Sequence, residues 1–351
     1  MTDNPVHVAL LVVSYRGEPY LQACLKSIEQ ASAPSLVLHT VVVDNASPDN
    51  TSPFIQATFP NVHLVKSTKN LGFAGGNNLG WQYIHEHLPD VQFVMLLNQD
   101  AEIGEQGILP LVQFMQQHPQ AGSVQPAIML HDSPNLLNTA GNQSHYLGFG
   151  IKTGYQCPIQ PDYDKPRTLD FASGCAVMLR TEILKQHGLF ADDLFMYLED
   201  AQLGWKLRIL GYENWYLPTA TVLHQYQFSS TLNSYEHLER NRWWMLLVFY
   251  RWPTLLLLLP ALMVMEVGQL AFALSQGNLR AKLKSYIPKD RKARKIQRQK
   301  MQALRTLTDR KLTEHFTPTI PPTELKHWAL QGIANPIFKL YWKLIRLLLW
   351  W

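Results

Sequence analysis

Three aspartates stand where a carboxylate could take part in chemistry: Asp44, Asp100 and Asp200. Asp100 follows an apolar run, and a carboxylate just past a buried strand can hold a hard divalent cation. The alternative role for Asp100 is that of a loop acid that caps the next helix. Asp200 follows Glu199, and two adjacent acids at a helix start also stabilise the helix dipole. His224 ends an apolar run, where a lone histidine is usually structural.

A glycine-rich segment, Asn70–Gly80, opens a predicted helix. Such a loop lets the backbone approach a ligand closely and points amide groups at anions, although it can equally be an ordinary flexible turn. Its spacing matches neither GxGxxG nor GxxxxGK[ST]. The segment therefore argues against a dinucleotide-dependent dehydrogenase and against a P-loop ATPase.

The first 125 residues alternate continuous apolar runs with helix-like segments. This pattern predicts an α/β fold with a mostly parallel sheet that is covered by helices on both faces. In such sheets a ligand binds beyond the carboxyl ends of the strands. The predicted strands in this part are 8–13, 36–43, 62–65, 91–97 and 123–130, and the predicted helices are 18–30, 53–58, 77–87 and 107–117.

Polar residues follow three of these strands, at the edge where a ligand would lie. They are Ser14 with Tyr15, Asp44 with Asn45, and Asn98 to Asp100. Beyond residue 130 the pattern predicts loops and short antiparallel strands over 131–170. It then predicts helices over 181–187 and 199–210 and strands near 213–216 and 220–223.

Composition and charge exclude several classes of protein. The chain has 351 residues, of which 46% are hydrophobic and 17% charged, so it is neither disordered nor a small disulfide scaffold. Its three cysteines are scattered, which fits a reducing compartment. Residues 280–311 contain thirteen Lys or Arg and two acids, whereas the chain before them is acidic. This asymmetry indicates an anionic partner, either lipid headgroups or nucleic acid.

Seven segments, taken in order, resemble the family 2 glycosyltransferases of the GT-A fold, in particular their bacterial rhamnosyltransferase-like branch. They fall within residues 1–250, and their order and spacing make the resemblance specific. The segments are Val12–Tyr15, Val42–Ser47, Asn70–Gly80, Leu96–Asp100, Ala172–Ala176, Phe195–Asp200 and Val222–His224.

The resemblance implies a role for each matching residue. Asp100 would hold a divalent metal, Mg²⁺ or Mn²⁺, with His224 as a candidate second ligand near the diphosphate. Asp200 would be the general base of an inverting transfer, because the acceptor hydroxyl must lose its proton. Ser14, Tyr15 and Asp44 would contact the nucleoside, and the set that binds the nucleotide sugar would also include Asn45, Gly72, Asn77 and Asn98.

The resemblance also implies the substrates. The donor would be a nucleotide sugar, such as a deoxythymidine-diphosphate or uridine-diphosphate rhamnose, and the acceptor a lipid-linked sugar or polysaccharide in cell-surface glycan synthesis. Two positions depart from the family pattern. Asn98 stands where the metal-binding motif often begins with Asp, and Gln202 replaces an acid two residues after the base.

The C-terminal hundred residues predict membrane association. The charge-free run Trp252–Met265 spans only about 21 Å as a helix, against ~30 Å of hydrocarbon. A single span would also place the basic segment 280–311 and the catalytic body on opposite sides. We therefore expect a peripheral or monotopic protein at the cytoplasmic face of the bacterial inner membrane, with 280–311 on anionic headgroups and 337–351 interfacial. The alternative is a buried helix packed on the domain.

These patterns predict three parts: a catalytic domain over 1–240, a helical membrane-associating region over 241–316, and a linker with an amphipathic helix over 317–351. The donor half of the catalytic domain would be 1–125 and the acceptor half 126–240. Two other functions stay open. A nucleotidyltransferase would carry a basic glycine-rich loop after its first strand, and a catalytically impaired membrane scaffold would fit the change at Gln202. The apolar segments beside 280–311 favour a membrane over nucleic acid.

Overall fold

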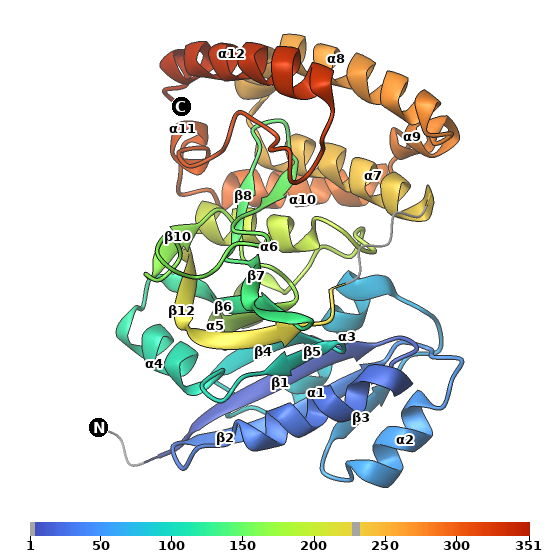
Figure 1. Ribbon diagram of the computed structural model, residues 1–351, viewed down its shortest axis with the longest axis vertical. Coiled ribbons are helices and arrows are strands. Elements are labelled where there is room, and N and C mark those ends of the chain that lie inside the picture. The colour runs from blue at the N-terminus through green and yellow to red at the C-terminus, as the bar shows by residue number, and fades with distance from the viewer. Residues whose placement is uncertain (1–3, 227–231) are drawn as a thin grey trace.

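Strands and helices alternate in the N-terminal part of the chain, and helices make up its C-terminal part (Figure 1). The computed structural model describes residues 4–226 and 232–351. The strands are β1 Val6–Ser14, β2 Leu36–Asp44, β3 His63–Lys66, β4 Phe93–Asn98, β5 Ala101–Ile103, β6 Ala121–Leu130, β7 Ser133–Thr139, β8 Asn142–Ser144, β9 Gly150–Lys152, β10 Arg167–Leu169, β11 Ala176–Arg180 and β12 Glu213–His224. The helices are α1 Glu18–Gln30, α2 Thr51–Thr58, α3 Gly72–His87, α4 Leu109–Gln117, α5 Thr181–His187, α6 Glu199–Ile209, α7 Leu232–Phe249, α8 Trp252–Ser275, α9 Leu279–Ser285, α10 Arg291–Ala303, α11 Asp309–Leu312, the π-helical turn η1 Leu330–Ala334 and α12 Asn335–Leu348.

A mixed sheet forms the centre, in the order β10-β12-β6-β11-β4-β1-β2-β3, with β5 beside β12 and β7 beside β6. Strands β4, β1, β2 and β3 are parallel neighbours, and β11 is antiparallel to β4 and β6 on either side of it. The register aligns Ser14 with Asp44 and Val13 with Asn98. The carboxyl ends of three parallel strands therefore meet at one edge of the sheet, as the sequence predicts.

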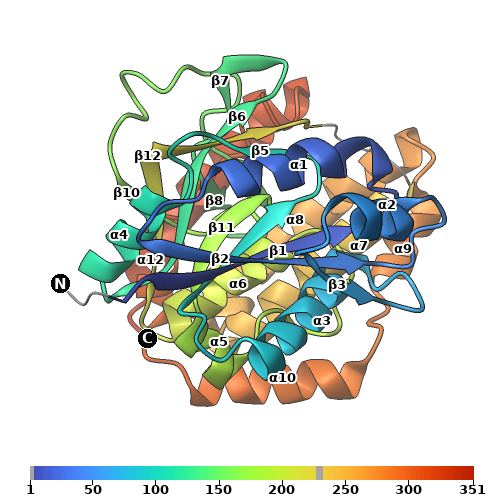
Figure 2. The same cartoon turned by 90° about the horizontal axis from the view of Figure 1, so that it is seen from below.

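The two faces of β1 show why the sheet is covered on both sides. Ala9 and Leu11 belong to one buried cluster with residues of α3, whereas Leu10 and Val12 belong to another with residues of α1. Successive side chains of a strand point to opposite faces, so a continuous apolar run needs a helix on each side. Figure 2 shows α1 and α3 on opposite sides of β1 and β2.

Three elements differ from the sequence prediction. The short strand β5 begins directly after Asp100 and pairs with β12, so Asp100 sits between two strands. Helix α3 begins at Gly72 rather than at residue 77, because packing outweighs the weak helix propensity of its glycines. The two strands predicted near 213–216 and 220–223 form the single strand β12, whose register shifts between Leu217 and Thr221. Pro218 lies in that shift and cannot donate a ladder hydrogen bond.

The C-terminal helices pack onto the body of the molecule. Trp342 of α12 stacks on Tyr146 with ring centroids 4.5 Å apart, and Tyr341 donates its hydroxyl hydrogen to the carbonyl of Leu257 in α8 at 2.5 Å. Helices α8 and α12 lie side by side at the end of the molecule farthest from β2 (Figure 1). The predicted boundary at residue 240 falls inside α7, which connects the sheet-bearing body to these helices.

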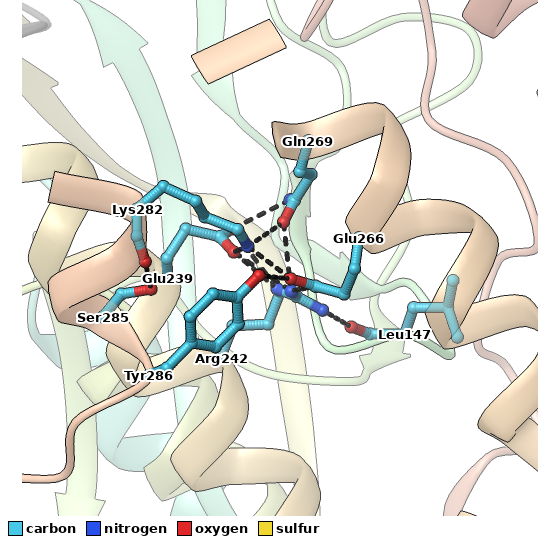
Figure 3. Close-up of polar contacts among 8 residues, drawn as sticks. All are labelled: Leu147, Glu239, Arg242, Glu266, Gln269, Lys282, Ser285 and Tyr286. Carbon is cyan, nitrogen blue, oxygen red and sulfur yellow. Dashed lines mark hydrogen bonds and ion pairs between the residues drawn. The ribbon is translucent and has the colours of Figure 1, made fainter. Parts of the chain in front are cut away.

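A buried ion network joins α7, α8 and α9 (Figure 3). Lys282 Nζ lies 2.5 Å from Glu239 Oε2 and 2.7 Å from Glu266 Oε2, and Arg242 pairs with the same two glutamates. Gln269 donates to Glu239 Oε1 at 2.9 Å. Burial works to raise the pKa of Glu239, but Arg242 and Lys282 outweigh it and hold that pKa below its ordinary value.

Candidate active site

The ends of β1 and β4 are joined through one amide side chain. Gln99 Oε1 accepts from Ser14 Oγ at 2.9 Å and from the Tyr15 amide at 3.0 Å, and Gln99 Nε2 donates to the Tyr15 carbonyl at 3.2 Å. Ser14 is buried, whereas Tyr15 is exposed. Gln99 lies in the motif segment Leu96–Asp100, but the sequence alone predicts no role for it. Its contact with Ser14 exists only because β1 pairs with β4.

Asp44 is held at the end of β2 by two donors. Its Oδ1 accepts from the Ser47 amide at 2.9 Å, and its Oδ2 accepts from the Ser52 hydroxyl. The side chain is nearly buried, while Tyr15 beside the same sheet edge stays exposed. A fixed carboxylate beside an exposed aromatic ring can accept a hydrogen bond from a nucleobase or a ribose and offer a surface for stacking.

The glycine-rich segment is shaped by Asn45. Its Oδ1 accepts from the Leu71 amide at 2.8 Å, and its Nδ2 donates to the Gly72 carbonyl at 3.0 Å. Gly72 has φ +71°, and a Cβ there would lie 2.3 Å from the Phe195 carbonyl oxygen, so only glycine fits. Asn77 is buried and donates to the Phe73 carbonyl in its own helix at 2.9 Å. Asn45 therefore fixes the shape of the loop, whereas Asn77 bonds within α3.

A cleft of about 320 Å³ brings together three of the predicted site residues, Asn98, Asp200 and His224. The others lie outside its lining: Ser14, Tyr15, Asp44, Asn45, Gly72, Asn77 and Asp100. Asn98 and His224 line it together with Glu199 and Asp200 from the start of α6. Asp100 does not line the cleft but contacts His224, with its Oδ1 3.4 Å from His224 Nε2. Three segments predicted to meet, at the ends of β4 and β12 and at the start of α6, thus face one space.

His224, which lines the cleft, and Asp100, which contacts His224, are the two residues predicted to hold a cation. Among residues 4–226 and 232–351, no three His, Cys, Asp or Glu side chains converge on one point. A hard cation at Asp100 would therefore complete its coordination with phosphate oxygens and water, as Mg²⁺ commonly does. Burial works to lower the pKa of His224, but Cys175 and Asp100 outweigh it and raise that pKa. The ring must lose its proton before it can coordinate a metal.

Asp200 lies in the first turn of α6. Its Oδ1 accepts from the Ala201 amide at 2.7 Å, and its Oδ2 is 3.4 Å from the Gly174 amide. Burial raises the pKa of Asp200, and burial together with the charge of Asp200 raises the pKa of Glu199. A carboxylate with a raised pKa is a stronger base, which suits the removal of a proton from a hydroxyl.

The backbone before α6 is strained and is held from α7. Tyr197 and Leu198 have φ of +68° and +61°, a region that residues other than glycine seldom adopt. Asn241 Nδ2 donates to the Met196 carbonyl at 3.0 Å and to the Tyr197 carbonyl at 2.7 Å. Strained backbone is common at functional sites, where the surrounding structure maintains it. Asn241 was missed in the sequence because it lies in a helix outside the recognised motifs.

Two further features of this region could not be read from the motifs. Lys152 Nζ lies 2.6 Å from the Tyr226 hydroxyl, and both residues line the cleft. Gln202, which replaces an acid of the family pattern, is buried, and its Oε1 is 3.4 Å from the Ala191 amide. Gln202 does not line the cleft, whereas Glu199 and Asp200 do. The change from an acid to Gln202 therefore removes no carboxylate from the cleft.

Comparison with known proteins identifies the family and the fold of the chain. The family described as Glycosyl transferase family 2 matches residues 9–188, more than half of the chain. The chain belongs to this family. The transferase is 28% identical over 259 residues to the N-acetylglucosaminyl-diphospho-decaprenol L-rhamnosyltransferase of Mycobacterium tuberculosis, covering 69% of this chain and 82% of that protein. It is 27% identical over 206 residues to the low-salt glycan biosynthesis hexosyltransferase Agl10 of Haloferax volcanii, covering 57% of this chain and 61% of that protein.

Solved structures share the fold of this transferase. GalNAc-T7 with UDP, GalNAc and Mn²⁺ superposes with a TM-score of 0.57 at 15% identity, over 70% of this chain and about half of that one (48%). S. aureus TarS 1–349 with UDP-GlcNAc gives a TM-score of 0.50 at 13% identity, over 97% of this chain and 92% of that one. The fold is the GT-A fold of glycosyltransferases, as the resemblance implies.

Proposed function

We propose that this transferase moves a sugar, with inversion and with the help of a divalent cation, from a nucleotide-sugar donor to a hydroxyl of a lipid-linked acceptor. The observation that carries the proposal is that Asp200 lines the same cleft as Asn98 and His224, with Asp100 in contact with His224. The name of the mycobacterial relative favours rhamnose as the sugar and a diphospholipid-linked sugar as the acceptor. The donor would then be a deoxythymidine-diphosphate or uridine-diphosphate sugar.

The transfer is a single in-line displacement at the anomeric carbon. The acceptor hydroxyl gives its proton to the Asp200 carboxylate while its oxygen forms the new glycosidic bond. The bond from the anomeric carbon to the diphosphate breaks on the opposite face, and the nucleoside diphosphate leaves with the electron pair. A base placed in this way contributes typically ~10²–10⁴-fold to the rate.

The donor would lie along the carboxyl edge of the sheet. Tyr15 and Asp44 would contact the nucleoside, with Ser14 fixing the turn through Gln99. Asp100 and His224 would face the diphosphate at the other end. When a divalent cation is bound there, the charge that develops on the leaving diphosphate is neutralised. Asn98, in contact with His224 at 3.4 Å, keeps that ring at the cleft.

We also propose that helices α8 and α12 attach the transferase to a membrane surface. Each exposes apolar side chains at helical spacing on the face turned away from the core. Nine exposed residues are spaced three or four apart: Trp252, Leu256, Leu259, Met263 and Val267 on α8 and Ile337, Leu340, Leu344 and Leu347 on α12. We call these nine residues the apolar face. An exposed apolar surface of this kind is typical of a lipid or protein contact.

The apolar face favours a monotopic arrangement over a span. Within the part of the chain that the structure describes, α8 is the one helix long and apolar enough to cross a membrane, and it continues past the charge-free run to Ser275. Its Glu266 is bound to Arg242 and Lys282 inside the protein (Figure 3). A span would expose these charges to hydrocarbon, which is costly. The helix therefore lies along the membrane.

Part of the basic segment is used inside the protein. Lys282 belongs to the buried network, Arg305 pairs with Asp309 at 2.9 Å, and Arg298 donates to the Tyr250 carbonyl at 2.8 Å. Helix α10 lies to one side of α8 and α12 (Figures 1 and 2). The exposed cations Lys339 and Lys343 on α12 are therefore closer to the apolar face than most of 280–311.

The direct test is transfer with a panel of sugar nucleotides. With Mn²⁺ present, we expect one or a few nucleotide sugars to raise the melting temperature, because a ligand that binds only the folded state stabilises it. The same sugars should be hydrolysed slowly to the nucleoside diphosphate. If no nucleotide sugar is bound or hydrolysed with Mn²⁺ or Mg²⁺, the proposed function is wrong.

A further inference from the structure

A second cavity, of about 220 Å³, lies between α7 and the segment that joins α9 to α10. Arg240 and Trp243 line it from α7, and Tyr286, Lys289 and Arg294 line it from the opposite wall. None of these residues lines the catalytic cleft. The motifs used above give this cavity no role.

Three basic and two acidic side chains line the cavity, and one of the basic ones, Arg240, pairs with Glu236 outside the lining. Among the residues that the structure describes, neither Lys289 nor Arg294 forms an ion pair with a carboxylate. Of the two acids, Asp290 is oriented by the first amides of α10, from which it accepts at 2.7 and 2.9 Å, and Asp193 accepts from Trp244 Nε1 at 3.2 Å. Burial and then the neighbouring Arg240 lower the pKa of Lys289, and Asp193 and Glu236 offset only part of that shift. Lys289 and Arg294 are the two cations of the lining that remain available to an anion.

The other walls of the cavity are apolar or aromatic. Trp243 and Tyr286 are part of the lining, and the buried Trp243 Nε1 has no hydrogen-bond partner in the described part of the chain. Leu283 and Ile287, which flank the lining residues Ser285, Tyr286 and Pro288 in the sequence, are 52% and 64% exposed. A pocket with two available cations, an unused donor and an apolar margin fits a ligand that is anionic at one end and apolar at the other.

The cavity shares a wall with the catalytic cleft. Lys289 Nζ lies 5.3 Å from the ring centroid of Phe195, in the segment that leads to the base. Asn241 lines the cavity, and its amide binds the carbonyls of Met196 and Tyr197, which line the cleft. A ligand anchored in the cavity would therefore be one loop away from Asp200.

We propose that this cavity binds the diphosphate of the lipid-linked acceptor, with Lys289 and Arg294 on the phosphate oxygens and the lipid chain leaving past Leu283 and Ile287. The proposal rests on the proposed function and adds the part of the acceptor that the cavity recognises. Guanidinium and ammonium groups bind phosphate oxygens with short charge-assisted hydrogen bonds. Anchoring the diphosphate here would present the attached sugar to Asp200 across residues 195–200.

The test measures the affinity of the full chain for farnesyl diphosphate in non-ionic detergent by isothermal titration calorimetry. EDTA is present, so that the diphosphate cannot occupy the cleft through a cation. We expect binding to the wild type and a loss of at least about tenfold in Lys289→Ala/Arg294→Ala, because each lost charged contact costs about tenfold or more. Lys292→Ala/Lys295→Ala is the matched control, since it removes the same charge from exposed positions of the same segment. It should bind as the wild type does.

Three results would overturn the proposal. The first is equal binding by both double variants. The second is equal binding of farnesol, which lacks the diphosphate, or of inorganic pyrophosphate, which lacks the chain. The third is displacement of farnesyl diphosphate by an equal concentration of phosphatidylglycerol in mixed micelles, which would make the cavity a general lipid headgroup site. Hydrolysis of a nucleotide sugar with Mn²⁺, measured on the same wild-type sample, reports on the proposed function separately.

Discussion

At the scale of single residues, the account depends on the environment of Asp200. The carboxylate is fixed by the Ala201 amide and lies near the Gly174 amide, next to the buried acid Glu199. Burial disfavours its ionised form and raises its pKa above the ordinary value of about 4. As the pH falls, the Asp200 carboxylate therefore becomes protonated at a higher pH than an exposed aspartate does.

The pH dependence of transfer follows from that shift. A raised pKa means that the carboxylate is protonated, and inactive as a base, at any pH below the shifted value. We expect kcat/KM for the acceptor to fall on the acid side with an apparent pKa clearly above about 4. Activity that persists unchanged down to pH 4 would show that Asp200 is not the base.

The sequence could predict these residues only in part. Asp44, Asp100 and Asp200 were found because each follows an apolar run or lies in a recognised motif. Gln99 and Asn241 act through partners 84 and 44 residues away. Such contacts depend on which strands pair and on which helix covers the loop, and no local pattern contains that information.

At the scale of elements, the buried network of α7, α8 and α9 provides a prediction about stability. Glu239→Ala leaves Arg242 and Lys282 buried without one of their carboxylates, so we expect a loss of about 3–5 kcal/mol in the free energy of unfolding. The exposed pair Lys311–Glu314, 2.5 Å apart, offers a matched control. Glu314→Ala should cost at most about 1 kcal/mol. Chemical denaturation of both variants measures the difference.

The same variant has a defined pH dependence. The pKa of Glu239 is lowered in the folded protein, so its contribution is complete above the unfolded value of about 4.3 and is lost as the pH falls through the lower folded value. The difference in stability between wild type and Glu239→Ala should therefore narrow only in acid. A difference that stays constant down to pH 2 would contradict the assigned ion pairs.

The elements themselves were largely predictable. The apolar runs predict β1, β2, β3, β4 and β6 within a few residues, and the spacing of apolar residues gives α1 with its observed ends. Strand β5 was missed because its three residues are too few to show alternation. The sequence also does not predict that β11 lies antiparallel between β4 and β6, because hydrophobic periodicity carries no information about strand order.

At the scale of the whole molecule, the apolar face should decide membrane attachment. Leu256→Glu/Leu340→Glu places a charge on each of its two helices, where both side chains are exposed and no packing is lost. We expect this variant to lose most of its binding to phosphatidylglycerol vesicles, because charges are strongly unfavourable in the apolar part of a bilayer. Vesicle flotation measures the bound fraction.

The control for that experiment is Ile296→Glu. Ile296 is also an exposed apolar residue, but it lies on α10, to one side of the apolar face. This variant should float with the vesicles as the wild type does. Equal binding by the wild type and Leu256→Glu/Leu340→Glu would show that another surface contacts the membrane.

The shared cleft is the central claim, and binding of the donor with Mn²⁺ in two variants tests it most directly. Titration of the sugar nucleotide found in the panel should give wild-type affinity for Asp200→Asn, with transfer reduced by ~10²-fold or more. Asp100→Ala should lose the part of the affinity that depends on Mn²⁺. If Asp200→Asn transfers sugar at the wild-type rate, or if Asp100→Ala keeps its full dependence on Mn²⁺, the two aspartates do not act on one donor and acceptor in this cleft.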